Sequence, residues 1–198
     1  STGSVRGPFE ISPVAANSAP TYPVLWSHDA KSARAICFDA DYEGIPRRGS
    51  TPMERATIDH KVKCIWASAS HCHFNQNFQF NSQSTGMQFT TRRTIGGRAW
   101  LSIRLSSAEK EKALVLWANT SLGLLLHWWH ANKQQSGRGS IGITALQDLP
   151  VLDVSALSKK QLKAAVQIFD DFKARSMRPI NEMTLDPVRQ ELDERFGK

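Results

Sequence analysis

Hydrophobic and polar positions alternate with a period of two in parts of the first 105 residues, which are predicted to be rich in β-strands. Between residues 71 and 80 every second side chain is polar, and the intervening positions include Cys72 and three phenylalanines. This period is typical of β-strands. The same reading predicts further strands at 34–38, 61–68, 86–91 and 98–104, with a Gly96-Gly97 turn between the last two.

Residues 1–24 and 39–56 are rich in proline, glycine and small or polar side chains. Such clusters are typical of loops and turns. We therefore predict loop or extended chain at 1–24 and a loop at 39–56, with Arg47 and Arg48 at the tip of that loop.

After residue 105 the apolar positions follow a helical period. Ser106 and Glu109 have the spacing of a capping box, and Ala113, Leu114 and Trp117 follow at helical intervals. The polar triplet at 119–121 interrupts this helix, and a second helix is predicted over 122–131. A polar loop at 134–139, a strand at 141–144 and an extended exit at 149–152 complete this part.

Two further helices are predicted in the last 40 residues. Ser158 and Gln161 form a second capping-box pattern. Asp186 precedes a proline at a first helical position, and Gly197 ends that helix. The chain is thus predicted to have a mixed α/β (α+β) fold. Its β-rich body at 1–150 contains two central helices, and a helical hairpin or arm follows at 151–198.

Acidic residues are absent from two long stretches of this basic chain, whose net charge is +7. The first lies between Asp59 and Glu109, and the second runs from Lys112 to Gln147. The cations within them are Lys61, Lys63, Arg92, Arg93, Arg98, Arg104, Lys112, Lys133 and Arg138. A surface without carboxylates attracts polyanions, of which DNA is the most common. The alternative is that these stretches are buried strands with few charges of either sign.

Amide side chains are dense between residues 75 and 83. Asparagine and glutamine can bond to adenine through two hydrogen bonds, as arginine can to guanine. The alternative is an ordinary polar strand face, and basic residues alone would only position a DNA backbone. We predict DNA contacts at Arg47, Arg48, Asn75, Asn77, Gln79, Arg92, Arg93, Lys133, Gln134 and Arg138.

Two other motifs receive different interpretations. The G-x-G-x-x-G pattern at 137–142 follows a polar loop rather than a strand, and a Leu-Pro exit soon follows it. We therefore interpret the motif as a glycine-rich connection that leads into a strand, and not as a dinucleotide site. Arg138 and the backbone N–H groups of this connection could bind a phosphate. The His71-Cys72-His73 triplet allows an alternative zinc site, completed by His127 and His130 at a spacing of three.

The sequence lacks the elements expected of a catalyst. It has no Asn-Pro-Pro-aromatic element for an adenine amino group and no glycine-rich turn at a strand end for S-adenosylmethionine. We expect no catalytic residues, metal or cofactor in this chain. Its three cysteines are too few for a disulfide framework, and no apolar run is long enough for a membrane span. A cytoplasmic location is the expectation.

Several motifs together resemble the C-terminal target-recognition region of N6-adenine DNA methyltransferases and of type I and fused type II restriction–modification enzymes. They lie at 6–9, 22–26, 78–83, 96–100, 116–123, 140–144 and 149–151. Thr120 stands where serine is usual in that family. The resemblance implies a domain that grips double-stranded DNA from one side. A separate methylase domain, which would hold S-adenosylmethionine, flips and methylates the adenine.

The leading hypothesis is sequence-specific DNA recognition, with double-stranded DNA and a methyltransferase domain as partners and no membrane association. A protein–protein scaffold domain of a defence complex is the alternative, in which the basic surface meets an acidic protein. A zinc-dependent nuclease built on the four histidines is the third hypothesis.

Overall fold

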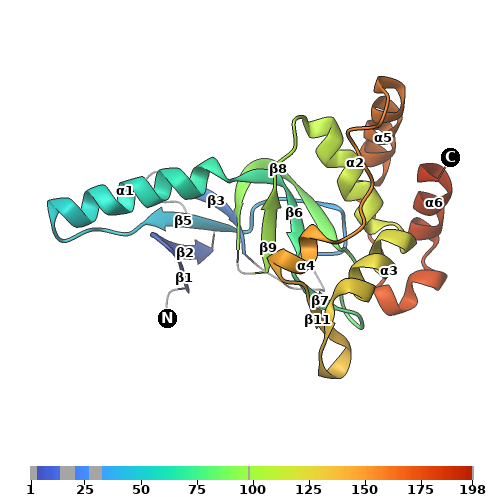
Figure 1. Ribbon diagram of the computed structural model, residues 1–198, viewed down its shortest axis with the longest axis horizontal. Helices are drawn as coiled ribbons and strands as arrows, with labels where there is room; N and C mark the ends of the chain where they lie inside the picture. Colours follow the sequence, from blue (N-terminus) through green and yellow to red (C-terminus); the bar gives the residue numbers. More distant parts are fainter. Residues whose placement is uncertain (1–3, 14–20, 27–32, 98, 198) are drawn as a thin grey trace.

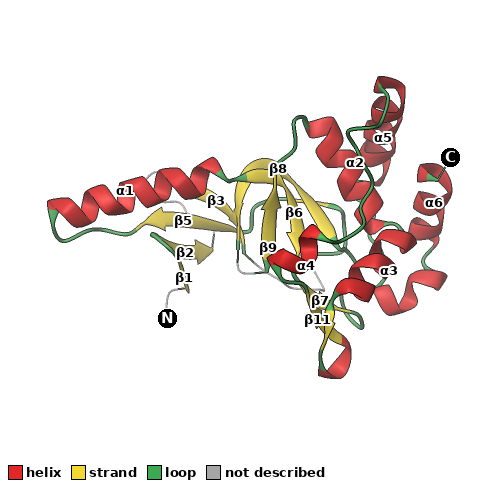
Figure 2. Cartoon of the chain, viewed as in Figure 1, coloured by secondary structure: helices red, strands yellow, loops and turns green. Residues whose placement is uncertain are grey.

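The computed structural model describes residues 4–13, 21–26, 33–97 and 99–197. A curled β-sheet forms the centre of the molecule, and helices gather mainly on one side of it (Figure 1, Figure 2). This mixed α+β architecture confirms the predicted fold class.

The main sheet combines strands that are far apart in the sequence. Its spatial order is β1 (Ser4–Arg6), β2 (Phe9–Pro13), β5 (Tyr42–Pro46), β3 (Tyr22–Leu25), β8 (Met87–Gly96), β6 (Ser70–Asn75) and β9 (Trp100–Ile103), while β4 (Cys37–Phe38) pairs with β8. The predicted strands near 86–91 and 98–104 are confirmed. The loop prediction for 39–56 is wrong in part, because β5 and the start of α1 (Pro52–Ala67) lie there. The loop or extended chain predicted for 1–24 contains β1, β2 and most of β3, and its residues 1–3 and 14–20 lie outside the described ones. Pairing along both sides of β5 stabilises these short strands despite their weak local pattern.

Helix α1 (Pro52–Ala67) replaces the strand predicted at 61–68. Thr51 accepts a hydrogen bond from the backbone of Glu54, whose side chain reaches back in a complete capping box. Ile58, Val62, Ile65 and Trp66 recur at helical spacing and pack against the sheet. The apparent alternation at 62–66 is one part of this helical stripe.

The break predicted at 119–121 separates α2 (Ala108–Asn119) from α3 (Ser121–His130). The cap of α2 is Ser107, not the predicted Ser106. Thr120 caps α3 by accepting from the Gly123 backbone. The buried Asn119 amide accepts from the Gly86 N–H and donates to the Met87 carbonyl, so the break joins both helices to the start of β8.

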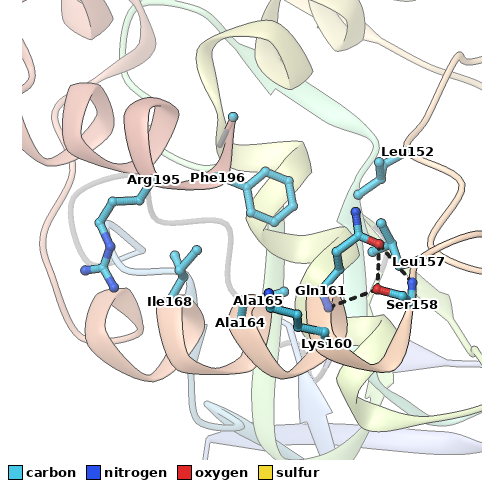
Figure 3. Close-up of a pocket in the computed structure, with 11 residues that line it drawn as sticks. Leu152, Leu157, Ser158, Lys160, Gln161, Ala164, Ala165, Ile168, Arg195 and Phe196 are labelled. Carbon is cyan, nitrogen blue, oxygen red and sulfur yellow. Dashed lines mark hydrogen bonds between the residues drawn. The ribbon is translucent and has the colours of Figure 1, made fainter.

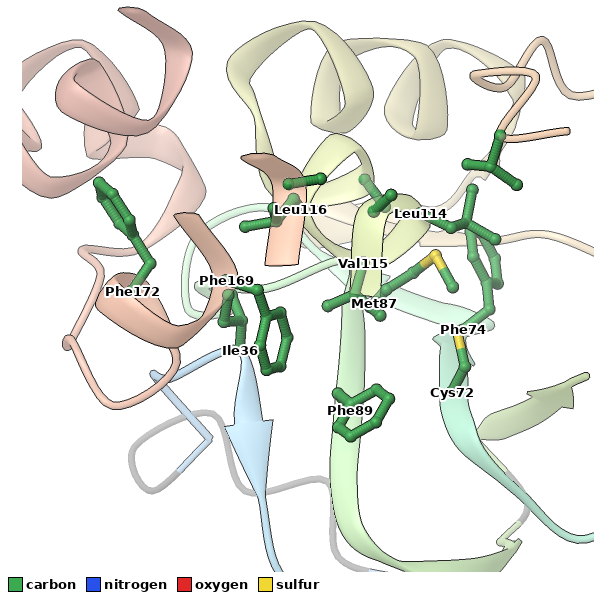
Figure 4. Close-up of a cluster of buried hydrophobic side chains, with 14 of the residues drawn as sticks. Ile36, Cys72, Phe74, Met87, Phe89, Leu114, Val115, Leu116, Phe169 and Phe172 are labelled. Carbon is green, nitrogen blue, oxygen red and sulfur yellow. The ribbon is translucent and has the colours of Figure 1, made fainter. Parts of the chain in front are cut away.

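The predicted C-terminal helices are α5 (Lys159–Phe172) and α6 (Pro187–Phe196), each with the expected N-cap. The short helices α4 (Ile143–Gln147) and η2 (Ile180–Leu185) lie before each of them. Phe169 and Phe172 of α5 share the main core with Met87 and Leu116 (Figure 4). Residues on both sides of position 150 therefore form one core, while the domain division there remains a prediction.

None of the helices in the described ranges is both long enough and apolar enough to cross a membrane.

Candidate nucleic-acid interface

A small second sheet gathers five of the predicted contact residues. Strands β10 (Asn132–Lys133), β11 (Arg138–Ser140) and β7 (Asn77–Gln79) pair in that order and are antiparallel. Arg138 lies opposite Gln79, and Ser140 lies opposite Asn77. Residues 59 to 63 positions apart in the sequence (138 minus 79 to 140 minus 77) thereby become neighbours. This sheet projects from the body below α3 (Figure 1).

The glycine-rich motif forms the hairpin of this sheet. The turn η1 (Gln135–Gly137) connects β10 to β11, and both Ser136 and Gly137 have positive φ, at 62° and 70°. Glycine adopts this backbone conformation without steric cost. The strand predicted at 141–144 is wrong, because the strand ends at Ser140 and α4 begins at Ile143. The interpretation of the motif as a connection agrees with this geometry.

A groove of about 300 Å³ runs over the small sheet. Its lining consists of Asn77, Phe78, Gln79, Gln134, Arg138, Gly139 and Ser140. The side chains of Asn77, Gln134 and Arg138 are exposed, and Gln79 is half-buried. Amide and guanidinium groups, the side chains best suited to reading base edges, thus share one open surface.

Aromatic packing holds this surface against α3. Phe78 is fully buried and its ring lies 4.5 Å from His127 and 5.5 Å from Trp128, measured between ring centroids. The Lys133 ammonium donates to the Trp129 carbonyl at 2.6 Å and lies within 6 Å of the centroids of the Trp128 and Trp129 rings. The groove therefore sits on a packed base rather than on a free loop.

Both acid-free stretches of the sequence meet in this sheet. Strand β7 belongs to the stretch between Asp59 and Glu109, and β10 and β11 belong to the stretch from 112 to 147. None of these three strands carries a carboxylate. The sheet is a basic and amide-rich surface whose own strands offer no negative charge to repel phosphates.

Asn75 does not reach the groove. It lies fully buried at the end of β6, and its side-chain oxygen accepts from the Asn77 backbone at 3.0 Å. The predicted alternation assumes one open face on this strand. Both faces of β6 are covered, because the consecutive residues 72–75 of the strand are all buried, and α2 packs against it.

Arg92 and Arg93 lie in the middle of β8 and face other neighbours. Arg92 is exposed and its guanidinium lies 3.6 Å from the carboxylate of Asp39. Arg93 donates to the carbonyls of Trp66, Ala67 and Ala69, and lies 5.3 Å above the Trp66 ring. Arg93 therefore binds the carboxyl end of α1, a helix with no basic residue in its own last turn.

We expect Arg93→Ala to lower the free energy of unfolding by about 1–3 kcal/mol, because helix carbonyls lose a charged donor. Urea denaturation followed by circular dichroism measures the change. Arg92→Ala is the matched control and should stay within about 0.5 kcal/mol, as is usual for an exposed ion pair. Equal effects of the two substitutions would contradict this role of Arg93.

Arg47 and Arg48 occupy the loop before α1, as predicted, and both side chains are exposed. This loop, which connects β5 to α1, lies at the end of α1 that is farthest from the body and well apart from β7 and β11 (Figure 1). Arg98, one of the cations counted in the first acid-free stretch, lies outside the described residues.

The four histidines of the zinc hypothesis do not converge. His71 stacks on Phe89, and the ring of His130 contacts the Leu126 carbonyl. His73 lies among the hydroxyl groups of β8 and β9, while His127 lies between Phe74 and Phe78. Among the described residues, no three His, Cys, Asp or Glu side chains come close enough to hold a metal. The zinc-site hypothesis is therefore wrong.

His73 and His127 are both buried and neutral. Burial lowers the pKa of His73 from its usual 6.5 to about 4, and burial lowers the pKa of His127 to about 3. Loss of hydration disfavours the charged ring in each case.

A larger hollow of about 680 Å³ lies between α5 and α6 (Figure 3). Leu152, Leu157, Ile168 and Phe196 give it an apolar lining. Arg195 at its edge is already held by Asp171 at 2.6 Å. None of the predicted contact residues lines this hollow.

The chain is therefore a mixed α+β protein in which an amide-rich groove is attached to a curled sheet. One solved structure with this fold is the type IIG restriction endonuclease BpuSI. The two align with a TM-score of 0.54 at 8% sequence identity, over 96% of this chain and 29% of that one. No protein-family model matches the sequence, and no curated protein matches it significantly. The likeness to BpuSI shows a shared fold.

Proposed function

We propose that this chain recognises specific sequences in double-stranded DNA as the target-recognition domain of a bacterial adenine-N6 methyltransferase or restriction–modification enzyme. The observation that carries the proposal is the meeting of the two acid-free stretches in the groove of β7, β10 and β11. The shared fold with part of a restriction endonuclease supports the same setting.

Each side chain of the groove has a distinct part in this proposal. The amides of Asn77, Gln79 and Gln134 can form hydrogen bonds with adenine edges. The guanidinium of Arg138 can form two hydrogen bonds with guanine. Lys133, fixed beside Trp129, contacts a phosphate and sets the register of the protein on the duplex. Methyl transfer, with S-adenosylmethionine, takes place in a separate domain.

Selection from a pool of randomised duplexes tests the proposal. We expect an enriched sequence motif, and an affinity that falls steeply between about 50 and about 200 mM salt, because cations released from DNA oppose binding. A pool with no enriched motif would contradict sequence recognition. An affinity that barely changes with salt would contradict the electrostatic part.

We expect Arg138→Ala to weaken binding to the enriched duplex by about 1–3 kcal/mol and to relax the selection at one base position. Fluorescence anisotropy with the enriched and a scrambled duplex measures both effects. Lys159→Ala, on the exposed start of α5, removes the same charge away from the groove and should leave the discrimination unchanged. Equal losses in the two variants would argue against readout by Arg138.

A specific feature also favours the protein-scaffold alternative. On α3, the side chains of Leu122, Leu125 and Trp129 are 60%, 46% and 77% exposed and recur along one face of the helix. Exposed apolar stripes of this kind mark protein contacts. If Leu125→Ser abolishes binding to the rest of the parent protein while Arg138→Ala leaves DNA retention intact, the scaffold function is favoured.

A further inference from the structure

Helix α1 is almost entirely exposed to solvent. Of its 16 residues only Val62 is buried. The helix extends away from the body alongside β5 (Figure 1). A long helix with so little burial gains little stability from packing. Such helices commonly contact another domain or a binding partner.

Three arginines surround a hollow at the outer end of α1. Arg47 and Arg48 come from the preceding loop, Arg55 comes from the first turns of the helix, and the hollow measures about 390 Å³. Gly49, Ile58 and Asp59 complete the lining. The lining thus contains three arginines and one acidic residue.

The local structure holds the loop of Arg47 and Arg48 against the first turn of α1. The Arg55 guanidinium donates to the Gly49 carbonyl at 3.2 Å, which joins the loop to the helix. A Cβ atom at Gly49 would lie 2.6 Å from the Arg55 backbone nitrogen, so only glycine allows this close approach. The carboxylate of Glu54, in the first turn of α1, accepts hydrogen bonds from the backbone N–H groups of Ser50 and Thr51.

The opposite end of α1 is anchored to the body. Arg93 and Arg104 both donate to the Ala67 carbonyl, and Trp66 packs into the core around Val62. Since one end is anchored and the other is capped, the helix holds the three arginines at a set place relative to the sheet.

We propose that Arg47, Arg48 and Arg55 bind phosphate groups of the DNA backbone, as a second contact separate from the reading groove. This inference rests on the proposed function. Guanidinium forks match the oxygens of a phosphate and form charge-assisted hydrogen bonds with it. Contacts to phosphates position the duplex and carry no sequence information. The α1 contact therefore contributes to affinity, and the groove contributes to discrimination.

The test compares the wild-type chain with Arg47→Gln/Arg48→Gln, in which both altered side chains are exposed. Affinities for the enriched and scrambled duplexes are measured across a salt series. We expect equal fold losses for the two duplexes. The salt slope should fall in magnitude by about 0.9 for each phosphate contact removed. The matched control, Lys159→Gln/Lys160→Gln, makes the same change in charge on α5 and should keep the wild-type slope.

Each outcome separates this inference from the proposed function. If Arg138→Ala loses discrimination but the α1 double variant keeps the wild-type slope, the phosphate contact is overturned and the reading groove stands. If the α1 variant loses slope while the groove variants behave as wild type, the groove is overturned instead. If the α1 variant loses only the binding of inorganic phosphate and not of duplex, the hollow is a small-anion site and the inference fails. A wild-type chain that binds no duplex overturns both.

Discussion

Replacing Arg189 with alanine is expected to lower the free energy of unfolding by about 3–5 kcal/mol, because it breaks a fully buried charged network. The guanidinium of Arg189 donates to the Asn119 carbonyl at 2.6 Å and to the Ser84 carbonyl at 2.7 Å. It also lies 3.8 Å from the buried Asp186 carboxylate. Alanine would leave that carboxylate and both carbonyls without their charged partner.

The network joins the C-terminal segment to the body, which makes the effect large. Arg189 belongs to α6, Asn119 ends α2, and Ser84 lies in the loop before β8. Chemical denaturation followed by circular dichroism measures the loss. Arg178→Ala is the control, since its exposed i,i+4 pair with Glu182 is worth at most about 0.5 kcal/mol. A loss below about 1 kcal/mol for Arg189→Ala would contradict this account.

Stability is also expected to fall by about 3 kcal/mol as the pH falls from 6.5 to 5. His73 and His127 have folded pKa values of about 4 and about 3, below the 6.5 of an ordinary histidine. The unfolded chain therefore binds more protons than the folded chain over this range. Each histidine contributes a slope of up to about 1.4 kcal/mol per pH unit. The loss begins as the pH falls through 6.5 and continues until it reaches the folded pKa of each ring.

His127→Gln separates the two contributions. A neutral side chain at 127 removes one of the two proton-binding groups, so the slope between pH 6.5 and pH 5 should fall by about half. Urea midpoints at a series of pH values give the slope. An unchanged slope in this variant would show that His127 does not titrate on unfolding. Exposed carboxylates such as Asp171, with a pKa held below its usual 3.8 by the hydrogen bond from Arg195, stay charged throughout this window.

Local signals in the sequence located several elements correctly. The Ser158–Gln161 capping box, the Asp186 N-cap and the break at 119–121 are confirmed. These signals work because a cap satisfies backbone groups within three or four residues of itself. The capping box of Thr51 and Glu54 is equally local and, if used, would have predicted α1.

Part of the candidate site was also predictable, because residue types carry its chemistry. Asn77, Gln79, Lys133, Gln134 and Arg138 were named from their amides and cations, and the structure places all five in or beside one groove or its sheet. Asn75 belongs to the same pattern and lies buried. A period of two divides a strand into faces, but it does not say whether one of them stays open.

By itself, the sequence determined the mixed fold class, the caps of α5 and α6 and the absence of carboxylates from two stretches, since these depend on neighbouring residues or on composition. Only the tertiary structure decided three contacts. The two acid-free stretches meet beside α3, Arg93 binds carbonyl groups at the end of α1, and Arg189 joins α6 to the body. The physical reason is that each of these contacts joins residues more than 20 positions apart. Their pairing depends on the packing of the whole chain rather than on local preference.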